Sequence, residues 1–335
     1  MNSMNIFVSQ HKSDSWDDFL TAENLEYLHS LGNVTINESE KPLTEDQLCE
    51  AIHNQDVLIT CWGVPKISER VLEHANRLKF IGHLAGSVAY LVGDAVYDKG
   101  IRVVCGNEAF AESVAEGTMA YILASQRRIT KFDREVHEEG WSAWPFVNYS
   151  LLRRKVGIIG FGAVAKYLVG MLKPFRAEIM VYSSHMTDEE AAKYGVTKAS
   201  LEEIFSTCSV ITLHTAQHPK TNGMINKELL AMMPKDALLV NTSRPAVLDE
   251  DALYEECKSG HIRAALDVYK NEGTIPLQSD LRELREVLMM PHHAGPTIDY
   301  RRYAARYVLE DLERFQKGEP LQHEIGKARM NTMTR

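Results

Sequence analysis

Three residues late in the sequence, Arg244, Glu272 and His292, could together perform acid–base chemistry on a small anion. A guanidinium binds a carboxylate through two parallel hydrogen bonds, and an imidazole gives or takes a proton near neutral pH. Each of the three follows a short apolar run, and His292 stands beside a second histidine, His293. Taken singly, such residues are more often surface, loop or turn residues. Their shared position after apolar runs favours one catalytic site.

A glycine-rich turn earlier in the chain is typical of a dinucleotide site. The segment 155–165 reads Lys-Val-Gly-Ile-Ile-Gly-Phe-Gly-Ala-Val-Ala, so the pattern G-x-G-x-x-A follows an apolar strand and opens a helix. Gly160 permits the tight turn, Gly162 lets the backbone approach a pyrophosphate, and the small Ala165 lets helix and strand pack closely. The helix N-terminus at Ala163 and Val164 favours phosphate anions. This context favours a functional turn over a mere connection.

The second strand of this candidate site is not followed by the carboxylate that usually binds the ribose of NAD. An Asp or Glu is expected about 20 residues after the turn, but Ser183, Ser184 and His185 follow the expected strand 178–182. The missing negative charge would otherwise repel a 2′-phosphate, and two hydroxyls could donate to one, although no arginine is adjacent. The sequence therefore leaves NAD and NADP both open as the cofactor.

These residues belong to a chain in which short apolar runs alternate with amphipathic helical patterns. We expect strands in two series, at 5–8, 57–60, 79–81 and 102–104, and at 155–159, 178–182, 210–213, 237–241, 263–268 and 287–290. Helix-capping signals at Thr44, Ser68, Thr187 and Ser200 mark helices between them. Strands that are so uniformly apolar belong to parallel sheets covered on both faces. The prediction is an α/β protein with two doubly wound parallel-sheet domains.

Further motifs recur in a fixed order from the middle of the chain to its end. They are Ala115-Glu116, Leu213-His214-Thr215, Met224-Ile225, Val240-Asn241 through Arg244, Asp249-Glu250, Gly260-His261-Ile262, Leu266-Asp267-Val268 and Pro291-His292-His293-Ala294-Gly295. With the glycine turn, they resemble the D-isomer-specific 2-hydroxyacid dehydrogenases, which include phosphoglycerate dehydrogenases and glyoxylate/hydroxypyruvate reductases. The resemblance implies a Rossmann NAD(P)-binding domain, residues 118–298, inserted into a flavodoxin-like substrate domain. Residues 1–117 would form that substrate-binding domain, and 299–335 a C-terminal helix returning to it.

The resemblance also implies an oxidoreductase that interconverts a 2-keto acid and a D-2-hydroxy acid by hydride transfer. Arg244 would bind the substrate carboxylate and polarise the carbonyl, and His292 would donate the proton to the carbonyl oxygen. Glu272 would orient His292 and stabilise its cation, and Asp267 would hold the nicotinamide amide. His292 fits the family pattern Pro-His-x-Ala-Gly, and in an extended segment His293 would point the opposite way. Other expected cofactor contacts are His214, Thr215, Thr242, Ser243 and Gly295.

The residues that would recognise the substrate match the family less closely. The segment Gly86-Ser87-Val88 is only loosely similar to a family loop of the type Gly-Val-Asp-Asn, and its backbone amides could bind a carboxylate. Pro245 stands where the family usually has Gly, and Gly273 where Pro is usual. The substrate is therefore not carried over. Two alternatives stay open: a dehydrogenase-like scaffold with an unrelated, larger substrate, and a dinucleotide-sensing interaction protein.

Composition argues against several other classes of protein. A net charge of −9 disfavours nucleic acid as a partner, and the five scattered cysteines show no spacing typical of disulfide frameworks or metal sites. Neither a signal peptide nor a membrane span is visible, so we expect a cytoplasmic protein with a small-molecule substrate, no metal and no membrane partner. A long helix expected at 110–128, rich in small residues, and the family resemblance together predict a homodimer.

Overall fold

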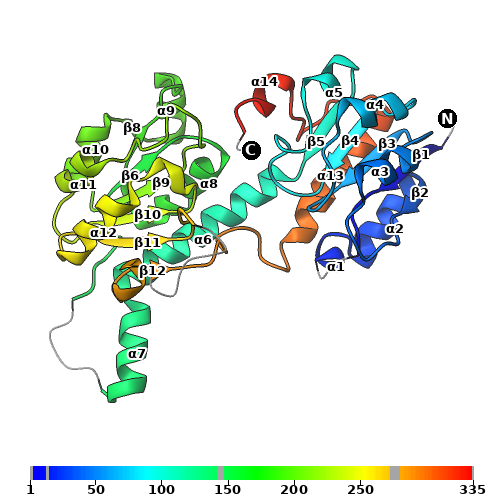
Figure 1. The fold of residues 1–335 in the computed structure, drawn as a ribbon. Helices are drawn as coiled ribbons and strands as arrows, with labels where there is room; N and C mark the ends of the chain where they lie inside the picture. Colours follow the sequence, from blue (N-terminus) through cyan, green and yellow to red (C-terminus); the bar gives the residue numbers. More distant parts are fainter. Residues whose placement is uncertain (1–2, 13–14, 142–146, 272–279, 334–335) are drawn as a thin grey trace. The chain divides into compact units, whose positions relative to one another are not determined.

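The structure is a computed structural model that describes residues 3–12, 15–141, 147–271 and 280–333. The chain divides into two compact units, which we call unit 1 (Met1–Phe110 with Pro296–Arg335) and unit 2 (Ala111–Gly295). Figure 1 shows each unit with its own sheet and helices. Unit 2 is thus inserted into unit 1, an arrangement that the family resemblance implied.

Unit 1 contains a sheet of five parallel strands in the order β2-β1-β3-β4-β5. The strands are β1 (Met4–Val8), β2 (Gly32–Ile36), β3 (Val57–Thr60), β4 (Phe80–His83) and β5 (Arg102–Cys105). This order is that of the flavodoxin-like doubly wound fold. The predicted fold of this unit is therefore confirmed.

Helices cover both faces of the unit 1 sheet, because alternate side chains of each strand point to opposite faces. Ile59 of β3 enters one core with α1, α2 and α13, whereas Leu58 enters a second core with α3, α4 and α5. The helices are α1 (Trp16–Phe19), α2 (Ala22–Leu31), α3 (Glu45–Ala51), α4 (Glu69–His74), α5 (Asp94–Asp98), α13 (Arg301–Lys317) and α14 (Lys327–Met330). Since α13 follows unit 2 in sequence, the end of the chain completes the core of unit 1.

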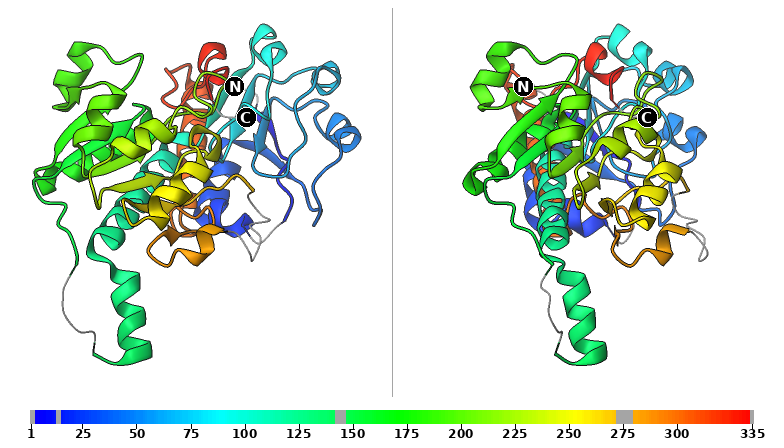
Figure 2. Two further views of the ribbon diagram at one scale, coloured as in Figure 1. Left: turned by 60° about the vertical axis from the view of Figure 1, so that its left-hand side comes forward. Right: turned by 90° about the vertical axis from the view of Figure 1, so that its left-hand side faces the viewer.

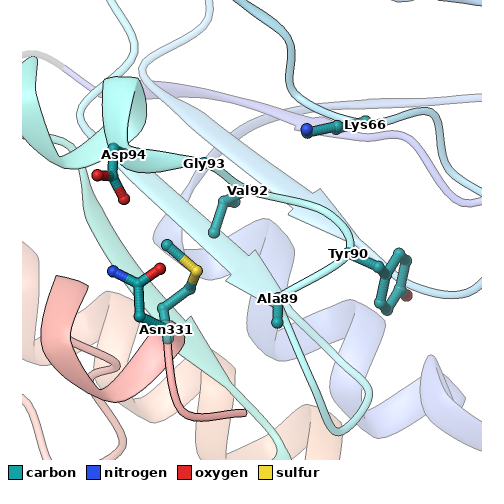
Figure 3. Close-up of a pocket in the computed structure, with 8 residues that line it drawn as sticks. Lys66, Ala89, Tyr90, Val92, Gly93, Asp94 and Asn331 are labelled. Carbon is teal, nitrogen blue, oxygen red and sulfur yellow. The ribbon is translucent and has the colours of Figure 1, made fainter. Parts of the chain in front are cut away.

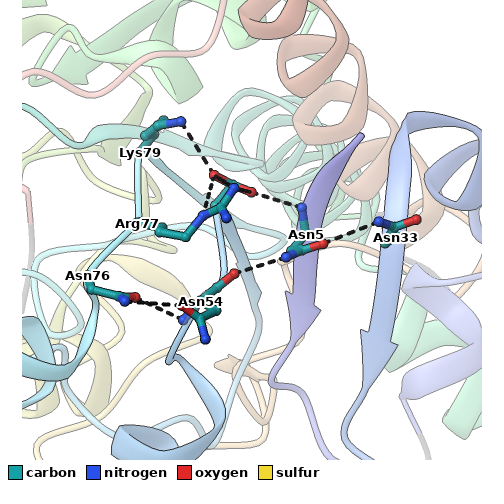
Figure 4. A network of polar contacts seen from close by, with 7 residues as sticks. Asn5, Asn33, Asn54, Asn76, Arg77 and Lys79 are labelled. Carbon is teal, nitrogen blue, oxygen red and sulfur yellow. Dashed lines mark hydrogen bonds and ion pairs between the residues drawn. The ribbon is translucent and has the colours of Figure 1, made fainter. Parts of the chain in front are cut away.

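A polar network surrounds the carboxylate of Asp56, which directly precedes β3 (Figure 4). The carboxylate accepts hydrogen bonds from the Asn5 backbone N–H at 3.0 Å, from Arg77 Nη2 at 3.0 Å and from Lys79 Nζ at 3.4 Å. Burial alone would raise the pKa of Asp56, but these donors outweigh it and lower the pKa below its ordinary value. The charged form of Asp56 therefore stabilises unit 1.

Unit 2 contains seven parallel strands in the order β12-β11-β10-β9-β6-β7-β8. The strands are β6 (Lys155–Ile159), β7 (Glu178–Tyr182), β8 (Thr197–Lys198), β9 (Val210–Leu213), β10 (Leu238–Asn241), β11 (Arg263–Leu266) and β12 (Leu288–Met289). Read from β8, the order is 3-2-1-4-5-6 with one further strand, which is the Rossmann topology. The strand order reverses between β6 and β9, where ligands of such sheets bind.

The unit 2 sheet is also covered on both faces (Figure 2). Ile158 of β6 packs with α6, α8 and α9, and Ile159 packs with α10, α11 and α12. The helices are α6 (Asn107–Arg127), α7 (Ile129–Glu139), α8 (Ala163–Leu172), α9 (Asp188–Tyr194), α10 (Leu201–Thr207), α11 (Lys227–Met232) and α12 (Glu250–Lys258), with short 3-10 helices η1 (Lys173–Phe175), η2 (Pro245–Val247) and η3 (Asp280–Glu283). No helix in the described part of the chain has the length and apolar character needed to cross a bilayer.

Three features differ from the sequence-based expectation. The strands β2 and β8 were not predicted, and α6 begins at Asn107 rather than near Phe110. Much of α6 packs inside unit 2, where Ala115, Met119 and Ile122 join the core beside β6. Its small residues thus serve packing within the chain.

Candidate active site

The turn after β6 requires glycine at its first position. Gly160 has a φ of +94°, and its N–H donates to the carbonyl oxygen of Tyr182 at 2.8 Å. A Cβ at this position would lie 2.6 Å from the carbonyl oxygen of His214 and 2.9 Å from Thr215 Oγ1. Only glycine therefore fits, because both the backbone angle and the loop after β9 exclude a side chain.

The N-terminus of α8, which this turn opens, has the features of an anion site. Gly162 is the N-cap, and no side chain caps the helix; a Cβ at Gly162 would meet nothing within 4 Å. The other four helices that follow β7–β10 are capped by side chains, namely Thr187, Ser200, Asn226 and Asp249. The first N–H groups of a helix have no intrahelical partner, so an uncapped N-terminus beside open space suits a phosphate.

The residues after β7 and β9 lie at the same edge of the sheet. Ser183, after β7, is half-buried and its Oγ accepts a hydrogen bond from the His185 N–H at 3.4 Å, while Ser184 is exposed. His214, after β9, has its Nε2 2.9 Å from Thr212 Oγ1. Burial lowers the pKa of His214 to about 4. This imidazole is therefore neutral near pH 7 and can contribute hydrogen bonds but no charge.

Arg244 is held by a tight turn after β10. The buried Asn241 donates from Nδ2 to the Arg244 carbonyl oxygen at 3.1 Å and accepts from the Ser243 N–H at 3.0 Å. Arg244 Nη1 donates to the Ser243 carbonyl oxygen at 2.7 Å. Thr242 is tied to α6, with its Oγ1 2.8 Å from Thr118 Oγ1. The turn thus fixes the base of the arginine side chain.

Asp267, after β11, binds three donors of the protein itself. Its Oδ1 accepts from the Tyr121 hydroxyl at 3.1 Å and from the His293 N–H at 2.8 Å, and its Oδ2 accepts from the Ala294 N–H at 3.0 Å. The residue is only 1% exposed. An ionised carboxylate has about four acceptor positions, so three are in use and one remains on Oδ2. The carboxylate fastens the segment after β12 to the end of β11.

The histidine segment is not extended as the sequence analysis assumed. His292 has a φ of +58°, in the left-handed region, and both His292 and His293 are exposed. The argument that neighbouring side chains must point in opposite directions therefore fails, because the two N–H bonds to Asp267 bend the chain here. The preference for His292 over His293 then depends on the sequence pattern alone.

One candidate residue lies outside the described part of the chain, and three others belong to unit 1. Glu272 lies outside the described residues, and Gly86, Ser87 and Val88 follow β4 in unit 1. The residues at the edge of the unit 2 sheet that the sequence analysis missed are on α6: Ser113, Gly117, Thr118 and Tyr121. Their spacing of three or four residues was visible as a helix face, but no sequence pattern linked that face to the site. Within the described residues, no three His, Cys, Asp or Glu side chains gather as a metal site requires.

Unit 1 has a cavity of its own next to the loop that follows β4. It measures about 470 Å³, and its lining includes Lys66, Tyr90, Asp94 and Asn331 (Figure 3). Tyr90 Oη lies 3.2 Å from Nε2 of the buried His83. Burial lowers the pKa of His83 to about 3. Lys66 and Asp94 give the cavity charges of both signs. None of the residues predicted from sequence lines it.

Comparison with known proteins identifies the family. The family model for the NAD-binding domain of D-isomer specific 2-hydroxyacid dehydrogenases matches residues 119–294, more than half of the chain. A D-3-phosphoglycerate dehydrogenase of Methanocaldococcus jannaschii is 33% identical over 304 residues, which are 90% of this chain and 57% of that protein. A glyoxylate reductase of Korarchaeum cryptofilum is 30% identical over 84% of this chain and 85% of that protein.

A solved structure agrees with this assignment. The crystal structure of a phosphoglycerate oxidoreductase from Rhizobium etli matches with a TM-score of 0.81 and 26% identity, over 96% of this chain and 98% of that one. The chain spans little more than half the length of the M. jannaschii relative. The chain therefore belongs to the D-isomer specific 2-hydroxyacid dehydrogenase family, and its unit 2 contains the NAD-binding domain of that family.

Proposed function

We propose that this protein interconverts a 2-keto acid and a D-2-hydroxy acid with a nicotinamide dinucleotide as hydride carrier. The observation that carries the proposal is the convergence of polar residues at one edge of one sheet. Arg244, Asp267 and His292 follow the adjacent strands β10, β11 and β12, and the glycine turn follows β6. Carboxyl ends of parallel strands share one edge, and ligands of such sheets bind there. Phosphate binding, carboxylate binding and proton transfer thus have their residues in one place.

The residues present fit a dinucleotide. The uncapped α8 and the open space at Gly162 suit the pyrophosphate, and Ser183 and Ser184 after β7 would meet the adenosine ribose or its phosphate. Thr215, Thr242, Ser243 and Gly295 would complete the contacts, with the neutral His214 and the remaining acceptor position of Asp267. When bound, the dinucleotide supplies or accepts the hydride. NAD and NADP are both compatible with a β7 end that carries hydroxyls and no carboxylate.

Three side chains would divide the chemistry between them. Arg244 would bind the carboxylate of the 2-keto acid and polarise its carbonyl, since a planar guanidinium binds a carboxylate at two points. His292 would give a proton to the carbonyl oxygen during reduction and remove it during oxidation. Glu272 would accept a hydrogen bond from the ring of His292 and so orient it. This division uses no metal ion.

Unit 1 would supply the remaining substrate contacts. In the proposed division of the chain, residues 1–117 and 299–335 bind the substrate, and 118–298 bind the cofactor. Backbone amides at Gly86, Ser87 and Val88 would bind a carboxylate of the substrate. The relatives are named for two different compounds, phosphoglycerate and glyoxylate, so they support a class of small 2-hydroxy and 2-keto acids rather than one member.

We also propose that the protein acts as a homodimer through α7. None of the residues of α7 is buried in the single chain, and Ile129 and Val136 on it are 55% and 50% exposed. Figure 1 shows α7 standing away from the sheet of its own unit. An exposed apolar face of this kind needs a partner, and a second copy of the chain supplies the same face.

The direct test is to follow the oxidation of NADH and of NADPH in parallel by absorbance. The panel of substrates is glyoxylate, hydroxypyruvate, pyruvate and bulkier 2-keto acids. The proposal predicts turnover with at least one of them and a preference for one of the two dinucleotides. A chain that binds the dinucleotide but is silent with every 2-keto acid would contradict the proposal and favour a sensor.

A further inference from the structure

One face of α6 follows the segment that carries His292. Ser113, Gly117 and Tyr121 are spaced four residues apart, so they lie along the same face of the helix. Ser113 Oγ donates to the Gly295 carbonyl oxygen at 3.5 Å, and a Cβ at Gly117 would lie 2.7 Å from the Ala294 carbonyl oxygen. Tyr121, one turn further along the helix, donates to Asp267. This face of α6 therefore lies along residues 294–295 and reaches the Asp267 carboxylate, which accepts from the N–H groups of His293 and Ala294.

Tyr121 is one of three hydrogen-bond donors to a buried carboxylate. Asp267 is acceptor-only when ionised, and besides Tyr121 it has the N–H groups of His293 and Ala294 as partners. With Asp267 at 1% exposure, water does not replace a lost donor easily. Burial and the neighbouring carboxylate raise the pKa of Tyr121. The hydroxyl therefore stays protonated and acts as a donor.

The two amides fixed by Asp267 directly follow a residue in a conformation that L-amino acids seldom adopt. His292 has a φ of +58°, and such a residue keeps its conformation only where its surroundings hold it. On its C-terminal side the backbone is held by the bonds from the His293 and Ala294 N–H groups to Asp267. A group that orients the Asp267 carboxylate therefore contributes to the position of the His292 backbone and imidazole.

We propose that Tyr121 is a positioning residue for His292: its hydroxyl orients the Asp267 carboxylate, which holds the amides of His293 and Ala294 and so fixes the left-handed backbone at His292. This inference rests on the proposed role of His292 as proton donor. Tyr121 does not touch the reacting atoms in this account. Its contribution is to turnover, because misplacing a proton donor by a fraction of an ångström to an ångström slows the chemical step.

The test compares Tyr121→Phe with Tyr27→Phe in the full-length protein. Tyr27 is a matched control, because its hydroxyl also donates to a carboxylate, that of Glu313 at 2.8 Å, but both residues lie in unit 1. Amide hydrogen exchange of His293 and Ala294 reports on the clamp, and steady-state kinetics with a dinucleotide-binding titration reports on function. A hydrogen bond to a charged group corresponds to roughly ten- to a hundredfold in an equilibrium.

Tyr121→Phe is expected to speed exchange at both amides about tenfold or more and to lower kcat by a similar factor. The KM for the 2-keto acid should stay within about twofold of the parent, since Arg244 is untouched. The Kd for the dinucleotide should rise by a smaller factor than kcat falls, because Asp267 is only one of its proposed contacts and the glycine turn is untouched. Tyr27→Phe should change neither readout. Unchanged exchange, or faster exchange with unchanged kcat, would overturn the proposal.

Two further measurements test the role of Tyr121 separately from the proposed function. If Tyr121→Phe does not fold, exchange in the unaltered protein decides: slow exchange at the amides of the exposed His293 and of Ala294 is expected, and fast exchange overturns the proposal. Failure of the proposed function is seen separately, as full turnover by a His292→Asn variant. In that case the exchange result on Tyr121→Phe still reports on the clamp.

Discussion

Replacing the glycines of the turn after β6 one at a time separates folding from dinucleotide binding. Gly160→Ala forces alanine to a φ of +94° and brings its Cβ to 2.6 Å from the His214 carbonyl oxygen. The backbone conformation costs about 1–2 kcal/mol and the overlap about 1–3 kcal/mol, so we expect a loss near 3 kcal/mol. For a unit of this size that corresponds to a fall of roughly 6–12 °C in Tm.

Gly162→Ala should behave in the opposite way. Gly162 has a φ of −88°, and a Cβ added there would meet nothing within 4 Å, so the variant should stay within about 1 kcal/mol of the parent in stability. Its methyl group would occupy the position where the backbone meets the pyrophosphate, and we expect the Kd for NADH or NADPH to rise at least tenfold, about 1.4 kcal/mol. Gly170→Ala, on the exposed side of α8, is the control and should leave binding unchanged.

The assay is urea or thermal unfolding of the three variants, with a fluorescence titration of each dinucleotide on the same samples. We expect Gly160→Ala to be unstable, and Gly162→Ala to be stable but to bind the dinucleotide at least tenfold more weakly. A Gly162→Ala protein that binds with the parent's Kd would refute the assignment of this turn to the pyrophosphate. A Gly160→Ala protein with the parent's Tm would refute the geometry of the turn.

Three further predictions concern catalysis, stability and assembly. His292→Asn should lower turnover by roughly 10²–10⁴-fold without changing the Kd for the dinucleotide, and undiminished turnover would remove His292 from the mechanism. Asp56→Asn should cost about 2 kcal/mol at pH 7, as judged from urea midpoints. Because the folded pKa of Asp56 lies below the unfolded value of about 3.9, this stabilisation is present above pH 4 and is lost as the pH falls through the folded pKa. The difference between parent and variant should therefore vanish in acid, and a difference that is constant with pH would contradict the ionic role. Val136→Lys on α7 should convert a dimer into a monomer in sedimentation, whereas a parent chain that is monomeric at all concentrations would refute the dimer.

The sequence predicted the parts of the fold that are buried on both faces. Strands such as Val57–Thr60 and Val210–Leu213 are wholly buried and read as continuous apolar runs. The capping residues Thr44, Thr187 and Ser200 were also predicted, and in the structure each side chain accepts a hydrogen bond from the backbone N–H three residues on. Local chemistry determines both kinds of signal, and no distant contact is needed to interpret them.

The parts that could not be predicted depend on contacts between distant segments. The edge strand β2 is partly exposed and β8 is exposed along its length, and neither contains an apolar run, so only their pairing partners define them. The left-handed backbone at His292 depends on Asp267, which lies 25 residues earlier in the numbering. Tyr121 reads in the sequence as one more apolar residue of a helix, and its hydroxyl gains a role only through that carboxylate.

We propose above all that this chain reduces a 2-keto acid to a hydroxy acid of the D configuration. The most direct measurement is chiral analysis of the product formed from the best 2-keto acid of the panel with NADH or NADPH. The account predicts the D-2-hydroxy acid as the sole product, with its formation lost in His292→Asn and in Arg244→Ala. Formation of the L enantiomer, or undiminished formation of the D enantiomer by both variants, would contradict it.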